Sequence, residues 1–301
     1  MKMVNARLSE AGGFVFSASA VFMIAAGLIF SLIVSIFKIN EDSDLYLYLN
    51  YLAAPVAMTS GILLTVNLKK LKFKEMFPVK CHPKYYLIAV LLIFGLLFSV
   101  SGVDSIFFKF ITLLGYNPRE AGAYFPNLTG GWVILALLVI AVMPAIFEEA
   151  LFRGVILNTC EKSMGSIRAI FVVGFCFSLF HASPEQTVYQ FLAGCMFAFI
   201  AIRSGSILPG ALMHFLNNGI LVVLSACGAF DEYGQLMISE GWGIAITALS
   251  AVAFIAGFLL LVFDKKPLVK GDKSCVKNFL IYASVGIGIL GLSWLLSFFM
   301  S

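Results

Sequence analysis

Apolar residues form long segments along this chain, separated by short polar stretches. A helix needs about 20 predominantly apolar residues to cross the hydrocarbon layer of a membrane. The pattern therefore predicts an all-α fold, a polytopic membrane helix bundle of about 8–9 transmembrane helices. A bundle of eight would require one weak segment, first of all 168–183, to be re-entrant. The candidate segments are 14–37, 46–67, 85–108, 132–160, 168–183, 187–203, 207–229, 243–263 and 279–300.

The composition agrees with a membrane protein and excludes other classes. Charged residues make up 12% of the chain and apolar residues 61%, whereas soluble domains contain roughly 25% and roughly 45–50%. A water-soluble globule, a disordered chain and a nucleic-acid-binding protein are excluded. We expect an integral membrane protein with the lipid bilayer as a partner, in the plasma membrane if the source is bacterial. We divide the chain into N-terminal helices (1–130), a core of the fourth to seventh helices (131–229) and C-terminal helices (230–301).

The distribution of Lys and Arg predicts the direction of the chain, because cytoplasmic loops are enriched in these residues. If the N-terminus is cytoplasmic, 17 of the 20 Lys and Arg residues fall on the inner side, mainly in the segments 68–84 and 264–277. The outer side then holds only Lys38, Lys109 and Arg119. We therefore expect a cytoplasmic N-terminus.

A few ionisable residues interrupt the apolar segments of the core. Such a group in the membrane interior costs at least about 2.5–3.5 kcal/mol on insertion scales, so each one calls for a functional or structural reason. Glu148, Glu149 and Arg153 lie in the fourth segment. His181 lies at the end of the fifth segment, and His214 lies in the seventh. These residues are the first candidates for a functional site.

Helical spacing gives the two acids different roles. Glu149 and Arg153 are four residues apart, so they lie on one face of a helix and can neutralise each other. Glu148 is displaced by about 100° around the helix and has no such partner in the sequence. We therefore expect the Glu148 carboxylate to be the one available for chemistry.

Two further pairs share a helix face, Phe177 with His181 and His214 with Asn218. Counted from the expected cytoplasmic helix ends at about 1.5 Å per residue, His181 and Asn218 lie about 18–20 Å deep. Glu148 reaches the same depth if the fourth helix continues without a break to about residue 160. The three segments could then contribute to one site.

Each of these features also has a purely structural interpretation. Glu149 and Arg153 could form a buried ion pair that only holds helices together. His214 and Asn218 could supply hydrogen bonds between helices, and His181 could be a satisfied core histidine. Two acids, two histidines and an amide at a matched depth are costly unless they act together, so we predict a shared functional site.

Three motifs in the core resemble those of the CPBP family. They are EExxxR at 148–153, FxxxH at 177–181 and HxxxN at 214–218, each about 30 residues from the next. The family comprises membrane-embedded proteases related to the CaaX prenyl endopeptidase of the Rce1 type, and the resemblance covers about a third of the chain. It implies a helical intramembrane endopeptidase in which Glu148 activates water. It further implies catalytic roles for His181, His214 and Asn218, with Glu149, Arg153 and Phe177 as supporting residues.

The residues themselves allow peptide hydrolysis in two ways. The reaction needs a base for water and a donor for the developing oxyanion. Glu148 could be the base, His214 and Asn218 the oxyanion donors, and His181 could orient the water or protonate the leaving amine. Alternatively, Glu148, His181 and His214 could be three ligands of a Zn²⁺ ion with an open fourth position. The sequence lacks HExxH, and we favour the metal-free version because a metal-bound Glu148 would leave little to act as the base.

The expected substrate is a membrane-associated peptide bond, in a prenylated or otherwise lipidated protein or in a peptide precursor. The competing interpretation is a non-catalytic membrane regulator, a bacteriocin-immunity protein or a transporter that uses the same polar cluster. Buried glutamate and histidine also serve proton-coupled transporters. Against transport, the sequence shows no inverted repeat and no pair of broken helices in matching halves.

Overall fold

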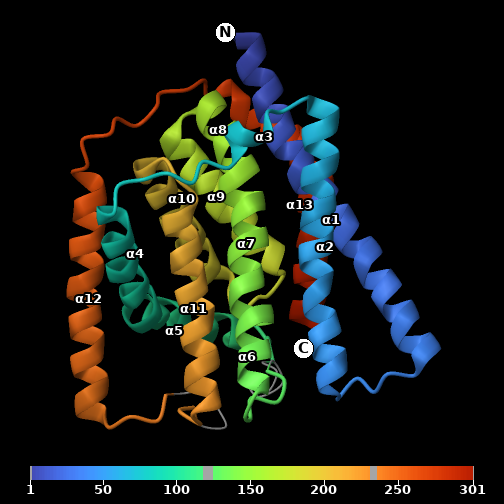
Figure 1. Cartoon of the computed structure of the whole chain (residues 1–301), viewed down its shortest axis with the longest axis vertical. Coiled ribbons are helices and arrows are strands. Elements are labelled where there is room, and N and C mark those ends of the chain that lie inside the picture. The colour runs from blue at the N-terminus through green and yellow to red at the C-terminus, as the bar shows by residue number, and fades with distance from the viewer. Residues whose placement is uncertain (1, 118–124, 231–235, 301) are drawn as a thin grey trace.

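The computed structural model describes residues 2–117, 125–230 and 236–300, and these residues form a helical bundle without β-strands (Figure 1). The all-α prediction is confirmed. Arg119 lies outside the described residues. The elements, with π-helical turns labelled η, are α1 (Lys2–Phe37), α2 (Asp44–Lys69), α3 (Phe73–Met76), α4 (Lys84–Gly95), η1 (Leu96–Val100), α5 (Ser101–Leu113), α6 (Trp132–Ala136), η3 (Leu137–Val142), α7 (Met143–Glu149), η4 (Ala150–Ile156), α8 (Leu157–Met164), α9 (Ser166–His181), α10 (Thr187–Ser204), α11 (Leu208–Ala226), α12 (Glu240–Val262) and α13 (Ser274–Phe299).

Within the described residues, eight helical runs are long and apolar enough to cross a membrane. The helix α9 is not among them. It has 16 residues, or about 24 Å, and so falls short of a hydrocarbon layer of about 30 Å. This helix corresponds to the segment 168–183, which the sequence pattern already identified as the weakest. It turns back at Ala182, which has a left-handed backbone conformation, and is followed by α10.

The fourth span is one continuous helical run, Trp132–Met164. It continues past Arg153 to beyond residue 160, as the matched-depth argument requires. The short helix α7 carries both acids of the first motif and lies between the π-helical turns η3 and η4. Gly154 in η4 leaves room for a neighbour, because a Cβ atom there would lie 2.4 Å from the Phe77 ring.

The helices α9 and α10 approach each other through glycines. A Cβ atom on Gly194 would lie 3.0 Å from the Cα atom of Gly174, and one on Gly174 would lie 2.3 Å from Cys195 Sγ. Small residues of this kind let helix backbones pack closely in membrane proteins. The close approach buries the backbone of α10 against the core and leaves the Gly194 carbonyl near the first motif.

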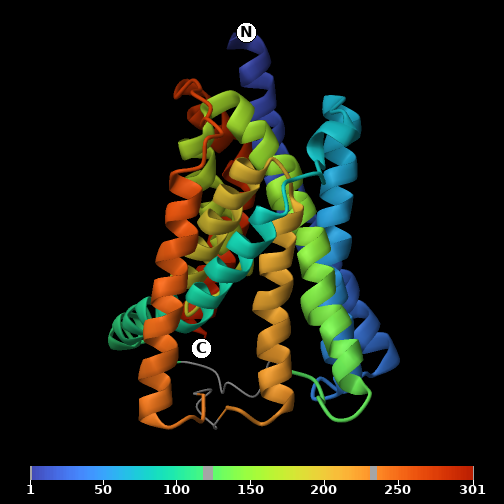
Figure 2. The same cartoon turned by 60° about the vertical axis from the view of Figure 1, so that its left-hand side comes forward.

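The basic segments of the chain gather at one end of the bundle. The N-terminus, α3, the end of α8 and the connection from α12 to α13 all lie at the upper end in Figures 1 and 2, and the C-terminus lies in the lower part. Both lysine-rich segments, 68–84 and 264–277, belong to this end. The two lysine-rich segments, which are far apart in the sequence, therefore lie together at one end of the folded bundle.

At this end, the connection between α12 and α13 is fixed by Asp264 and Arg203. Lys84 Nζ donates to Asp264 Oδ2 at 2.6 Å, and Tyr85 donates to the same oxygen at 3.0 Å. Arg203 donates to the backbone carbonyls of Asp264 and Val262 at 3.3 and 3.0 Å. Burial raises the pKa of the Asp264 carboxyl, but the hydrogen bonds from Lys84, the Lys266 backbone N–H and Tyr85 outweigh it and hold the pKa below its ordinary value.

We expect the substitution Asp264→Asn to lower the thermal stability of the solubilised protein at neutral pH. The loss should be small, because Lys84 is half exposed and its ion pair is screened by water. A carboxyl with a lowered pKa stabilises the fold above the unfolded-state pKa of about 4 and loses this effect as the pH falls through the folded-state pKa.

The melting-temperature difference between the wild type and Asp264→Asn should therefore shrink below about pH 4. Asp42→Asn, in an exposed turn, is the control and should leave the melting temperature unchanged. A difference that stays constant down to pH 2 would contradict the assignment.

Candidate functional site

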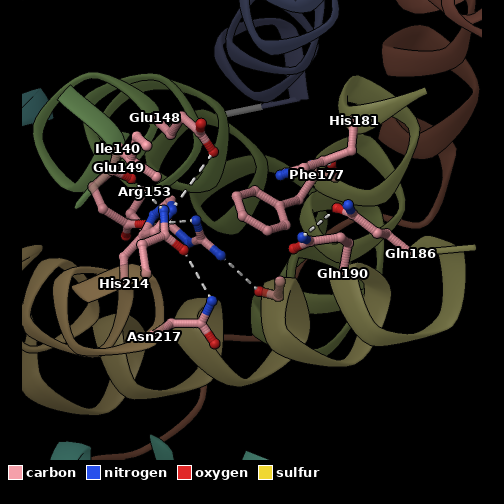
Figure 3. A network of polar contacts seen from close by, with 12 residues as sticks. Ile140, Glu148, Glu149, Arg153, Phe177, His181, Gln186, Gln190, His214 and Asn217 are labelled. Atoms are coloured by element: carbon pink, nitrogen blue, oxygen red, sulfur yellow. Dashed lines mark hydrogen bonds and ion pairs between the residues drawn. The ribbon is translucent and has the colours of Figure 1, made fainter. Parts of the chain in front are cut away.

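The three motifs meet inside the bundle. Side chains from α7, η4, α9 and α11 converge there, and the first turn of α10 borders them (Figure 3). Glu149, Arg153 and His214 are almost fully buried, and the Phe177 side chain packs among them. Segments that are far apart in the sequence thus contribute polar groups to one region.

Glu149 and Arg153 form the expected buried ion pair. Arg153 Nη1 lies 2.6 Å from Glu149 Oε1, and their side chains are 0% and 1% exposed. Arg153 Nη2 donates to the Gly194 carbonyl of α10 at 3.1 Å. The guanidinium also lies over the rings of Phe177 and Phe197, at 4.6 and 4.9 Å from their centroids. The charge is therefore compensated by one carboxylate, one carbonyl and aromatic faces.

His214 connects the two acids. Its Nδ1 atom lies 3.0 Å from Glu149 Oε1, and its Nε2 atom lies 3.8 Å from Glu148 Oε2. If Nδ1 donates to the Glu149 carboxylate, Nε2 of the neutral ring is an acceptor directed at Glu148, and Nε2 of the protonated ring is a donor. Gly210, one turn before His214, allows this approach, because a Cβ atom there would lie 2.9 Å from Glu149 Oε2.

Glu148 differs from Glu149 in its surroundings. Its side chain is 15% exposed, against 1% for Glu149. One oxygen of each acid, Oε2, is buried without a hydrogen-bond partner among the described residues, which is costly for an ionised carboxylate. Glu149 uses its other oxygen for Arg153 and His214, whereas the Glu148 carboxylate has only His214 Nε2 beside it, at 3.8 Å.

His181 ends α9 and reaches the same region as Phe177. Its Nδ1 atom lies 2.8 Å from the Phe177 carbonyl, the hydrogen bond that fixes the ring at the end of the helix. The Phe177 ring contacts both histidines, with centroids 4.8 Å from His181 and 5.8 Å from His214. Figure 3 shows the His181 ring beside Phe177, across from the acids of α7.

Asn218 makes hydrogen bonds of its own. Its Nδ2 atom donates to the Ile140 carbonyl of η3 at 2.8 Å, and its Oδ1 atom accepts from Asn217 at 2.9 Å. Asn217 in turn accepts a hydrogen bond from the Tyr189 hydroxyl. One N–H of the Asn218 amide thus holds the fourth span, and the amide carries a second N–H.

Sequence reasoning missed three of these partners: the Gly194 carbonyl, Tyr189 and the contact of His214 with Glu149. A backbone carbonyl has no sequence signal. Tyr189 carries a weak one, since it belongs to a cluster of polar residues between α9 and the middle of α10. The His214 contact depends on how α11 packs against α7, which helical spacing within one segment does not reveal.

For the zinc version of the mechanism, the described residues show no preformed set of metal ligands. Among residues 2–117, 125–230 and 236–300, no three His, Cys, Asp or Glu side chains are placed so that they could hold a metal ion. The Nδ1 atoms of His181 and His214 are held by the Phe177 carbonyl and by Glu149, so Nε2 would be the ligating atom of each ring. We therefore derive no step that passes through a metal.

Comparison with known proteins agrees with the motifs. Residues 130–220 match the family model described as type II CAAX prenyl endopeptidase Rce1-like. No curated protein and no solved structure matches the chain. The matched region runs from the start of α6 into α11 and includes Glu148, Glu149, Arg153, His181 and His214. Residues 130–220 are thus similar to the Rce1-like family of membrane endopeptidases, the family that the three motifs resemble.

Proposed function

We propose that the protein is an intramembrane endopeptidase that hydrolyses a peptide bond in a membrane-associated substrate, with Glu148 as the base that activates water. One observation carries this proposal: the Glu148 carboxylate lies 3.8 Å from His214 Nε2 and is the more exposed of the two acids, while the fully buried Glu149 is paired with Arg153. The prenyl endopeptidase activity named in the family description favours a prenylated or otherwise lipidated protein as the substrate.

The step we propose needs no group beyond water and the peptide. The water oxygen forms a bond with the carbonyl carbon while Glu148 accepts a proton from the water. His214, oriented through Nδ1 by Glu149, donates from Nε2 to the oxyanion in its protonated form, and the second N–H of Asn218 can add to this. The C–N bond then breaks, and the leaving amine takes the proton that Glu148 received from the water, either directly or by way of His181.

The experiment that tests the proposal compares membrane peptides in cells that produce the wild type or Glu148→Ala at equal levels. Peptides that accumulate as uncleaved precursors only with Glu148→Ala identify the substrate and its cleaved bond. Identical peptide profiles, together with a cellular effect that survives the substitution, would favour a binding, immunity or transport role.

We further propose that the end of the bundle with the lysine-rich segments faces the cytoplasm. The supporting observation is that 68–84 and 264–277 lie at the same end as the N-terminus, as expected if positive charge is retained inside. A single cysteine introduced at Lys74 should then resist an impermeant thiol reagent in intact cells and react after permeabilisation. Labelling of this site in intact cells would reverse the orientation.

A further inference from the structure

The backbone carbonyl of Ile140 lacks the hydrogen-bond donor that a regular α-helix would supply. Pro144 lies four residues later and has no N–H, so it cannot make the α-helical hydrogen bond to this carbonyl. Asn218 of α11 donates to it instead, at 2.8 Å. A polar group inside the apolar fourth span is thus satisfied from a different helix.

This contact lies at the π-helical turn that precedes the acids. In η3 the Met143 N–H donates to the Leu138 carbonyl, five residues earlier. A π-helical turn of this kind accommodates one extra residue, and one residue corresponds to about 100° of helix rotation. The direction of Glu148, two turns further along, therefore depends on whether η3 keeps this hydrogen-bond pattern.

The hydrogen bonds extend beyond Asn218 to α10 and α5. Asn217 donates to Asn218 at 2.9 Å, and the Tyr189 hydroxyl donates to Asn217. The backbone N–H of Tyr189 donates to Asp104 of α5 at 3.1 Å. Because Tyr189 is in the first turn of α10, Asp104 caps that helix from outside and compensates the positive end of its dipole. Tyr189 is thus held at both its backbone and its hydroxyl.

The same helix α11 contacts the acids through His214, one turn before Asn218. Two points of attachment, His214 at Glu149 and Asn218 at Ile140, fix the fourth span against α11. His214 fixes the span at the level of Glu149, and Asn218 fixes it a second time at η3. We propose that Tyr189, acting through Asn217 and Asn218, is a positioning residue that holds η3 in its π-helical form and so directs Glu148 at His214.

This inference rests on the proposed function, and Tyr189→Phe tests it. The substitution removes one hydroxyl and keeps the ring, so the fold should be retained. We expect kcat to fall about fivefold to tenfold, the effect of one lost hydrogen bond. KM should not change, because the substitution alters the orientation of Glu148 and not the binding of the substrate. Tyr46→Phe, on α2 and remote from the site, is the matched control and should keep the wild-type kcat.

A double-mutant cycle with Asn218→Ala separates positioning from an independent role of each residue. If both act through Ile140, the double variant should lose little more activity than the more affected single variant, whereas independent effects would multiply. Multiplying effects, or a wild-type kcat in Tyr189→Phe, would overturn the inference. If the inference is overturned while Glu148→Gln is inactive in the same assay, only the role of Tyr189 is wrong. If Glu148→Gln is active, the proposed function is wrong as well.

Pro144→Ala gives a second test that does not depend on Tyr189. It restores an N–H that can donate to the Ile140 carbonyl and thus favours a regular α-helix over η3. We expect an equal or higher melting temperature and a lower kcat, because Glu148 turns away from His214. A wild-type kcat in this variant would contradict the role of η3.

Discussion

Glu148→Gln should abolish peptide hydrolysis and leave the melting temperature of the protein close to that of the wild type. Glutamine has nearly the same shape as glutamate but cannot accept a proton from water. General-base catalysis contributes about a hundredfold to ten-thousandfold, so we expect kcat to fall by at least about a hundredfold. The fold should tolerate the change, because Glu148 Oε2 has no hydrogen-bond partner to lose.

The measurement is turnover of a lipidated peptide by the purified protein in vesicles, with thermal unfolding recorded on the same preparation. Glu75→Gln is the control for loss of one acidic side chain, since Glu75 is half exposed and pairs only with surface lysines. Full turnover by Glu148→Gln would remove the assignment of Glu148 as the base.

The bundle and the Glu149–Arg153 pair could be predicted because both follow from patterns within single segments. A run of about 20 apolar residues is itself the condition for a spanning helix. Two residues four apart lie on one face whatever the rest of the fold does. The same argument explains why α9 was recognised as the weak segment, since its length alone falls short of the membrane.

The contacts that join different helices could not be predicted in this way. The position of His214 against Glu149 requires α11 to approach α7 closely, which Gly210 permits. The bond from Asn218 to Ile140 requires the π-helical turn η3, and helical spacing assumes a regular α-helix throughout. Pro144 lacks a backbone N–H and so disturbs the fourth span, but its presence in the sequence does not reveal which residue of a distant helix compensates for it.

The matched depths were informative because they combined three segments. They predicted that Glu148, His181 and the HxxxN motif would come near each other, but gave no orientation around each helix axis. The orientation is decided by packing. The glycine contact of α9 with α10 places the Gly194 carbonyl at Arg153, and the rings of Phe177 and Phe197 then surround the ion pair. The arrangement of the candidate catalytic groups thus depends on residues that have no catalytic chemistry of their own.

Glu149→Gln should act on the fold and not only on activity. It leaves the fully buried Arg153 without its carboxylate and removes the partner of His214 Nδ1. Breaking a buried ion pair by removing one member costs about 3–5 kcal/mol. We therefore expect a much lower melting temperature and less protein in the membrane, in contrast to Glu148→Gln.

The double variant Glu149→Gln/Arg153→Met tests whether the stranded charge is the cause. Methionine removes the guanidinium and fills part of its volume among Phe152, Phe177 and Phe197, so stability should recover in part. Activity should not recover, because the neutral glutamine no longer stabilises a protonated His214 that faces Glu148. Thermal unfolding and turnover measured together distinguish the two effects. If the double variant is no more stable than Glu149→Gln, the loss arises from the His214 contact, and the ion pair is not the main support of the site.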